Sequence, residues 1–173
     1  LHFPNSKEGR PLKAKFKRGF EYSDCWVEDS RLVILNARDA QDRGATILPR
    51  VKLIKAERTK NYWILTFQDQ KTNQEWQQKA RYLINAAGPW VGSILKEKLG
   101  QVDMPLIRLV RGSHLVVKKQ YDHEKAYFLQ GSDGRIVFAI PYEQDFTLIG
   151  TTDVDHDSAQ IKPVCTDEER DYL

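Results

Sequence analysis

The 173-residue sequence contains little that would cross-link it, bind a metal or hold it inside a membrane. Only two cysteines occur, Cys25 and Cys165, and their spacing fits neither a disulfide scaffold nor a metal site. No stretch approaches the roughly 20 apolar residues that a membrane-spanning helix needs. We therefore expect a reducing compartment, no bound metal, and only peripheral contact with any membrane.

The glycines exclude one familiar way of binding nucleotides. None of the ten lies two residues from another, so the sequence has no G-x-G-x-x-G fingerprint, and it has no Walker loop. If a dinucleotide binds this protein, its pyrophosphate contacts some other segment.

Charge is present but unevenly placed. The net charge is only +3, yet six basic residues cluster near the start with one opposing acid, and they are Lys7, Arg10, Lys13, Lys15, Lys17 and Arg18. Such a run suits contact with phosphates or a membrane surface, but a solvated connecting segment is the commoner case. We predict that residues 1–17 form a basic loop, and we expect no nucleic-acid partner.

The first half of the sequence predicts a mixed α/β region. A helix is expected over residues 29–44, with Asp29 or Ser30 capping its start and Gly44 ending it. Three strands over 45–58, 61–69 and 74–80 would form an antiparallel meander. The apolar run 81–88 predicts a parallel strand buried on both faces, followed by a helix between Pro89 and Gly100.

The character of the sequence changes near residue 100. Longer alternating strands are expected over 107–119, 126–130, 134–143 and 145–153, as in an antiparallel sheet with one wet face. Thr166 and Glu169 have the spacing of a capping box that opens a helix. Because the sequence stops soon afterwards, we expect it to be a segment of a longer protein. The fold class is predicted as α+β (α/β).

Two places could meet a ligand through the backbone or a single side chain. At "AAGPW" (86–90) Gly88 would let a phosphate, ribose or ring edge approach the start of a helix, although Pro and Gly at such a turn more often have a purely geometric role. His114 follows Gly-Ser within an apolar strand, where it could act as a general base or simply hold the structure by hydrogen bonding.

Two further places carry charge or hydroxyl groups. Arg135 could hold a carboxylate or phosphate, or could be a surface arginine at a hairpin end. Thr151, Thr152 and Asp153 follow an apolar strand and could orient a polyol, or merely form a turn and helix cap.

Five stretches, taken in order, resemble the FAD-dependent glycerol-3-phosphate dehydrogenases. They are "KRGFEYSDCWVEDSRLV", "LINAAGPWV", "IRLVRGSHLVV", "RIVFAIPY" and "LIGTTDVD". The resemblance implies a segment of a respiratory flavoenzyme that oxidises sn-glycerol 3-phosphate to dihydroxyacetone phosphate and passes electrons to quinone. It also implies a fold related to D-amino acid oxidase: part of a three-layer FAD-binding domain over residues 18–100, and part of an antiparallel-sheet substrate (cap) domain over 101–173.

The resemblance also implies roles for individual residues. FAD would contact Ala86, Ala87, Gly88, Pro89 and Trp90, with most of its site outside this chain. The catalytic region would contain His114 as base and Arg135 as phosphate clamp, together with Thr151, Thr152 and Asp153. Arg108 and Arg111 would be weaker helpers.

The resemblance further implies a cytoplasmic location or a peripheral position on the cytoplasmic face of the inner membrane, and a homodimer is possible. Two alternatives stay open. One is an amine or amino-acid oxidase of the same fold, and the other is a non-catalytic binding module whose basic run meets an acidic partner.

Overall fold

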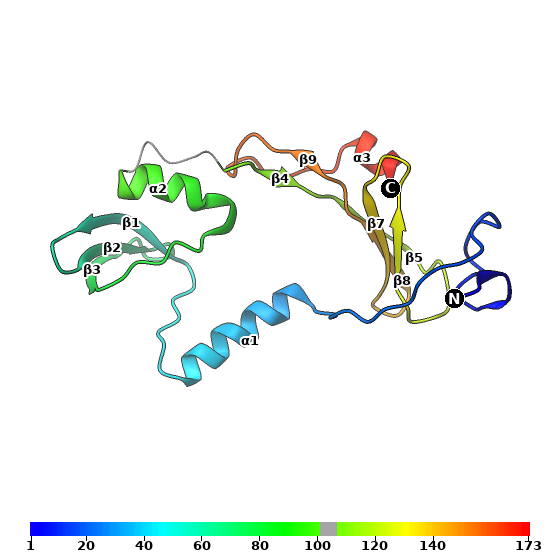
Figure 1. The fold of residues 1–173 in the computed structure, drawn as a ribbon. Coiled ribbons are helices and arrows are strands. Elements are labelled where there is room, and N and C mark those ends of the chain that lie inside the picture. The colour runs from blue at the N-terminus through cyan, green and yellow to red at the C-terminus, as the bar shows by residue number, and fades with distance from the viewer. Residues whose placement is uncertain (101–106) are drawn as a thin grey trace. The chain divides into compact units, whose positions relative to one another are not determined.

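The computed structural model describes residues 1–100 and 107–173 (Figure 1). The chain divides into two compact units. One unit combines Leu1–Ser23 with Arg108–Leu173, and the other is Asp24–Ile107. The basic segment 1–17 therefore folds with the C-terminal part of the chain.

The Asp24–Ile107 unit contains the predicted meander. Strands β1 (Val51–Arg58), β2 (Trp63–Asp69) and β3 (Glu75–Ala80) pair antiparallel in that order, with a bulge between Leu53 and Lys55. The first strand was predicted to begin at residue 45, which is wrong by six residues. Pro49 lacks the N–H that a strand ladder needs, and Arg50 has a φ of 61° that strands do not adopt.

Helix α1 (Asp29–Asp42) occupies the predicted segment, and Gly44, with a φ of 94°, follows its last turn. The residue that caps its start is Glu28, which makes no side-chain capping bond, so the predicted Asp29 or Ser30 cap is wrong. No residue of α1 is buried within the described chain, although its centre is apolar: Leu32, Val33, Ile34 and Leu35.

The expected buried strand at 81–88 is not a strand. Residues 81–87 belong to no helix or strand, Gly88 begins a 3-10 turn, and Tyr82 and Ile84 are 82% and 85% exposed. A parallel strand is stable only between neighbouring strands, and the described residues offer none beside it. The prediction of a strand at 81–88 is therefore wrong: the apolar pattern is present, but the described residues provide no neighbouring strand for it.

The predicted helix after this segment is confirmed. A short 3-10 turn, η2 (Gly88–Trp90), leads into α2 (Val91–Leu99), which ends at Gly100 in the left-handed conformation. The left-handed residue lets the Gly100 N–H bond to the carbonyl of Leu95.

The other unit is built on a four-stranded antiparallel sheet of order β5-β8-β7-β6, comprising His114–Lys118, Phe146–Gly150, Ile136–Tyr142 and Tyr127–Gln130. Two predicted strands differ from the structure. Residues 107–119 split into β4 (Val110–Arg111) and β5, and the strand predicted over 145–153 ends three residues early, at Gly150. A further short strand, β9 (Val154–Asp155), follows it. Strands β4 and β9 pair in a separate two-stranded sheet.

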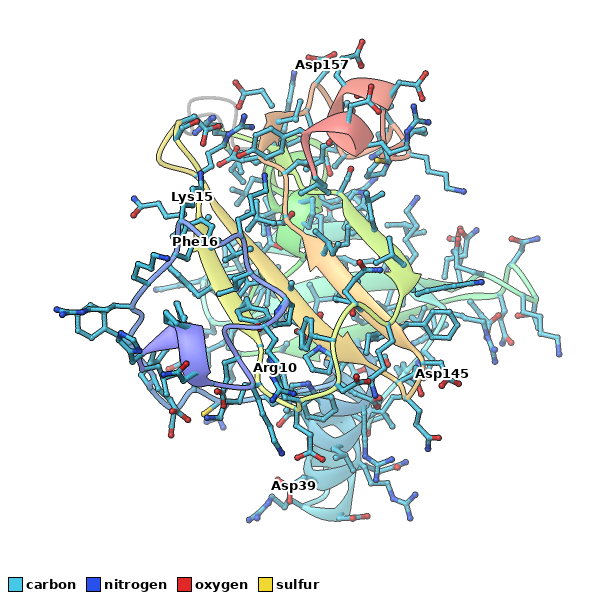
Figure 2. All side chains as sticks on the ribbon, turned by 90° about the vertical axis from the view of Figure 1, so that its right-hand side faces the viewer. Arg10, Lys15, Phe16, Asp39, Asp145 and Asp157 are labelled. Carbon is cyan, nitrogen blue, oxygen red and sulfur yellow. The ribbon has the colours of Figure 1, made fainter. Side chains whose placement is uncertain are left out.

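The N-terminal segment, which begins with a 3-10 turn (η1, Phe3–Asn5), is attached to β6 (Figure 2). The Tyr127 hydroxyl donates to the Glu8 carbonyl over 2.6 Å, and the Lys125 ammonium pairs with the carboxylates of Glu8 and Glu21 at 2.9 and 2.7 Å. At the other end of the chain, helix α3 (Asp167–Tyr172) begins with the predicted capping box. No helix among residues 1–100 and 107–173 is long and apolar enough to cross a bilayer.

Thr147 in β8 provides a test of how β8 and the segment after β5 are joined. Its side chain is 1% exposed, and its hydroxyl accepts from the Gln120 N–H over 3.1 Å. Thr147→Val keeps the shape but leaves that N–H without its partner, so we expect the free energy of unfolding to fall by about 1–3 kcal/mol. Chemical denaturation measures it, with Thr147→Ser, which keeps the hydroxyl, as the control. Equal stability of the valine variant and wild type would refute the role of this bond.

Candidate functional site

The site forms where the chain leaves the four-stranded sheet for the two-stranded one. On one side Gly112 and Ser113 separate β4 from β5, and on the other Thr151–Asp153 separate β8 from β9. The Ser113 N–H donates to the Thr152 hydroxyl over 2.8 Å, and the Thr152 N–H donates to the Ser113 carbonyl over 3.3 Å. The two crossings are thus held together as one corner.

Glycines make this corner possible. A Cβ on Gly112 would overlap the Thr151 hydroxyl oxygen, and a Cβ on Gly150 would overlap the imidazole of His114. His114 pairs with Gly150 across β5 and β8. Its ring therefore lies directly over the Gly150 backbone, and the residue itself remains exposed to solvent.

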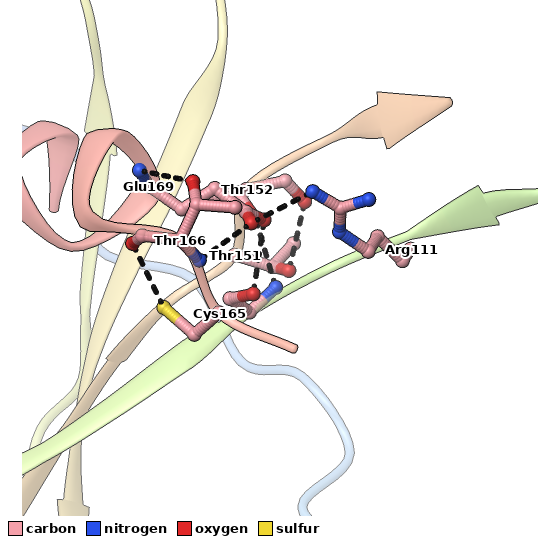
Figure 3. Close-up of polar contacts among 7 residues, drawn as sticks. Arg111, Thr151, Thr152, Cys165, Thr166 and Glu169 are labelled. Atoms are coloured by element: carbon pink, nitrogen blue, oxygen red, sulfur yellow. Dashed lines mark hydrogen bonds and ion pairs between the residues drawn. The ribbon is translucent and has the colours of Figure 1, made fainter. Parts of the chain in front are cut away.

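Four residues, three of them distant in the sequence, donate to the carboxylate of Glu169 on α3 (Figure 3). Oε1 accepts from the hydroxyls of Thr152 and Ser113 at 2.7 and 2.9 Å. Oε2 accepts from the Arg111 guanidinium and the Thr166 N–H, both at 3.0 Å. An ionised carboxylate has about four acceptor positions, and here four donors fill them.

These hydrogen bonds stabilise the ionised form of Glu169. Its side chain is 5% exposed, which by itself would favour the neutral acid. The Thr152 hydroxyl and the Thr166 N–H, helped by Arg111 and Ser113, outweigh burial and lower the pKa of Glu169 from 4.5 to about 2. The group is therefore an anion at neutral pH.

Arg135 lies just before β7, at the end of the sheet where β5 begins and β8 stops. Its Nε pairs with the Asp133 carboxylate, and its guanidinium lies 3.8 Å from the ring centre of Tyr172. Within the described chain its two terminal nitrogens make no hydrogen bond. The guanidinium is thus held from one edge and one face, and the pKa of Arg135 is raised by the hydrogen bond to Asp133.

The remaining predicted residues of this region differ in accessibility. Thr152 is 3% exposed and its hydroxyl is used twice, whereas the Thr151 hydroxyl donates to the Thr152 carbonyl over 2.9 Å. Asp153 is exposed, and its charge contributes to raising the pKa of Arg135. The helper arginines are both paired, Arg108 with Asp155 at 2.7 Å and Arg111 with Glu169.

The predicted cofactor residues, Ala86–Trp90, belong to the other unit and form a tight turn. The Asn85 side chain donates to the Val91 carbonyl over 3.1 Å, and it accepts from the Ala87 N–H over 3.4 Å. Gly88 has a φ of 53° and open space where a Cβ would stand, and α2 begins without a side-chain cap. The backbone of this turn is therefore accessible to a flat or anionic group.

Sequence reasoning missed the residues that organise both places. Asn85 was treated as an interruption of an apolar run, although an Asx side chain beside a Gly-Pro turn is a recognisable signal. Glu169 was assigned only to the capping box. Its partner Arg111 is 58 residues away in the sequence, and no local pattern predicts that contact.

Comparison with known proteins defines the class. The FAD dependent oxidoreductase family matches residues 3–173, and the chain belongs to this family. Glycerol-3-phosphate dehydrogenase of Pseudomonas aeruginosa is 47% identical over 163 residues, which cover 94% of this chain and 32% of that protein. D-erythritol 1-phosphate dehydrogenase of Brucella abortus is 39% identical over 173 residues, covering 100% of this chain and 34% of that protein.

A solved structure agrees with these relatives. The glycerol-3-phosphate dehydrogenase from Bacillus halodurans, complexed with FAD, superposes with a TM-score of 0.70 at 31% identity, covering 83% of this chain and 29% of that one. The family resemblance and the mixed α/β class predicted from sequence are confirmed. The chain spans about a third of the length of the curated relatives it matches.

The Glu169 network predicts a particular response to acid. A carboxyl whose pKa is lowered by folding stabilises the protein above its unfolded pKa, and that stabilisation is lost as the pH falls. For Glu169 the window runs from pH 4.5 down to about 2. Glu169→Gln should lower stability at neutral pH and flatten its decline across this window, as measured by thermal melts at each pH. Asp171→Asn, an exposed carboxylate on the same helix, is the control and should follow wild type. An equally steep decline in Glu169→Gln would contradict the assignment.

Proposed function

We propose that this chain is a segment of a flavoenzyme that oxidises sn-glycerol 3-phosphate to dihydroxyacetone phosphate. The observation that carries the proposal is that His114 and Arg135 lie at the same end of the four-stranded sheet, in a chain of the FAD dependent oxidoreductase family. One group can accept a proton and the other can bind a phosphate. These are the two tasks that oxidation of a phosphorylated alcohol requires of the protein.

The turn Ala86–Trp90 is proposed to contact FAD. Gly88 leaves its backbone open, and the uncapped start of α2 offers N–H groups to a ligand. When bound, the flavin supplies the hydride acceptor, and its electrons are passed on to quinone. The chain would contribute the backbone of this turn, which the Asn85 side chain stabilises by its hydrogen bond to Val91.

His114 is proposed to take the proton from the secondary hydroxyl of the substrate. The imidazole is exposed to solvent and can accept a proton at a ring nitrogen, as a general base must. Because its ring lies over Gly150 and its backbone is paired with β8, its position is defined before substrate binds. The substrate hydroxyl can therefore be met with little reorganisation.

Arg135 is proposed to bind the substrate phosphate. A phosphate dianion taken from water needs paired cations, and a planar guanidinium offers two parallel donors. Contact with Asp133 and Tyr172 orients the guanidinium while leaving its terminal nitrogens available within the described chain. Thr151 and Asp153 lie at the same corner and are proposed to contact the polyol part of the substrate.

The finer architecture belongs to the same proposal. Residues 18–100 would be part of a three-layer FAD-binding domain, and residues 101–173 part of the substrate (cap) domain. The exposed apolar residues Tyr82 and Ile84 support this, because a strand of that composition is suited to burial between neighbours. A homodimer and a peripheral position on the cytoplasmic face of the inner membrane stay predictions.

A second substrate has specific support. The relative from Brucella abortus is named for D-erythritol 1-phosphate and matches the whole chain. Both compounds join a phosphate to a polyol, so the same arginine could serve either. The two proposals differ only in how much room lies beyond the reacting hydroxyl.

The test is turnover by the full-length protein that contains this segment, with each polyol phosphate and an artificial electron acceptor. We expect activity with sn-glycerol 3-phosphate. His114→Ala should lower kcat by about 10²–10⁴, the usual contribution of a general base. Arg135→Ala should mainly raise KM, because it removes binding that ground state and transition state share.

Matched controls are His2→Ala and Arg170→Ala, whose side chains are exposed and which should behave as wild type. Faster turnover of D-erythritol 1-phosphate would select the second substrate. Oxidation of an amine in place of either phosphate would overturn the proposal and make Arg135 a carboxylate ligand. No flavin-dependent turnover of any of these compounds would favour a binding module.

Gly150→Ala tests separately whether catalysis depends on the position of the His114 ring over Gly150. The added methyl group must displace the imidazole, because the ring occupies that space. A misplacement of about 1 Å can cost roughly 10²-fold in rate, so we expect kcat per bound flavin to fall by about 10- to 100-fold. Bound flavin is measured by absorbance to show that the variant is folded. Unchanged kcat in a flavin-loaded variant would mean that His114 does not act from this position.

A further inference from the structure

Glu169 is hydrogen-bonded to residues that adjoin β5, which carries His114, and β8, which pairs with β5. Ser113 immediately precedes His114, and its hydroxyl donates to Glu169 Oε1. Thr152 lies two residues after Gly150, over which the imidazole sits, and its hydroxyl donates to the same oxygen. One carboxylate oxygen thus accepts from the residue just before β5, which carries His114, and from a residue just after β8, which pairs with it.

Every polar group of Ser113, in the backbone and in the side chain, makes a hydrogen bond. Its N–H bonds to the Thr152 hydroxyl, its carbonyl accepts from the Thr152 N–H, and its own hydroxyl bonds to Glu169. The Thr152 hydroxyl accepts from Ser113 and therefore has its single proton free for Glu169. The orientation of this hydroxyl requires an acceptor at Glu169 Oε1.

Helix capping does not explain the arrangement. A capping box needs only one acceptor oxygen at this position, and glutamine serves there as well as glutamate. In this structure Oε2 accepts the Thr166 N–H that completes the box, whereas Oε1 faces only Thr152 and Ser113. The capping box requires neither Oε1 nor the negative charge of Glu169.

We propose that Glu169 is a positioning residue for His114, acting through Ser113 and Thr152 on the two strands that hold the imidazole. This rests on the proposed function for the role of His114 itself. Glu169 does not touch the substrate. It keeps the corner closed so that the histidine meets the reacting hydroxyl at a fixed distance, and its ionised form is required because only that form accepts from all four donors.

The experiment compares full-length, flavin-loaded variants by kcat and KM per bound flavin. Glu169→Gln keeps one acceptor oxygen for the helix cap and places an amide where an acceptor is needed. We expect kcat to fall by about 10- to 100-fold, as a misplaced catalytic group predicts, with KM within about threefold. Thr152→Val should reproduce the loss, and Thr152→Ser, which keeps the hydroxyl, should restore kcat to within about threefold of wild type.

Glu168→Gln is the matched control, because Glu168 is an exposed carboxylate one residue earlier on α3. It should leave kcat unchanged. If Glu169→Gln melts at lower temperature but retains wild-type kcat per bound flavin, Glu169 only anchors the helix and the proposal is wrong. Equal kcat for Thr152→Val and Thr152→Ser would also overturn it.

A second readout is independent of turnover. The imidazole resonances of His114, assigned by their loss in His114→Ala, should shift in Glu169→Gln and Thr152→Val and stay in place in Glu168→Gln. If wild type does not oxidise sn-glycerol 3-phosphate but these shifts occur, the proposed substrate fails while the positioning role stands. If turnover is found and the resonances do not move, the positioning role fails alone.

Discussion

The corner between the two sheets depends on one buried, ionised carboxylate. Glu169 accepts from Thr152, Ser113, Arg111 and Thr166, which join α3 to β4 and to the crossings after β4 and β8. A buried charge is costly unless every acceptor position is used, and here the donors come from three separate stretches of chain. The same saturation that makes the carboxylate tolerable also makes the corner specific, since no partner can move without leaving another unpaired.

The corner also requires that backbone segments approach each other closely. His114 can lie over β8 because Gly150 has no side chain, and the crossing strand can approach Thr151 because Gly112 has none. The position of the His114 ring therefore depends on the absence of side chains at Gly150 and Gly112. Arg135 is fixed differently, by an acid at one edge and the Tyr172 ring at one face. The two chemical groups are thus oriented by independent contacts.

Local sequence patterns were sufficient wherever the determining interactions are local. The meander, α2 with its left-handed Gly100, and the capping box of α3 were predicted from turn residues, spacing and alternation, and all three are confirmed. The pattern failed at 81–88 because strand formation there depends on neighbouring strands, and residues 1–100 and 107–173 place none beside it. It also failed at residues 107–119, where one apolar run serves two sheets and the break at Gly112 is set by the opposite crossing.

The sequence by itself determined the family and most of the helices and strands, and it supplies an imidazole at position 114 and a guanidinium at position 135. Those properties reside in single residues and short motifs. Only the tertiary structure decided that Glu169 and Arg111, 58 residues apart, would pair, and that Thr152 would be buried beneath the corner instead of lying open at it. Contacts of that separation depend on how the two crossings meet in space, and a one-dimensional pattern contains no information about that meeting.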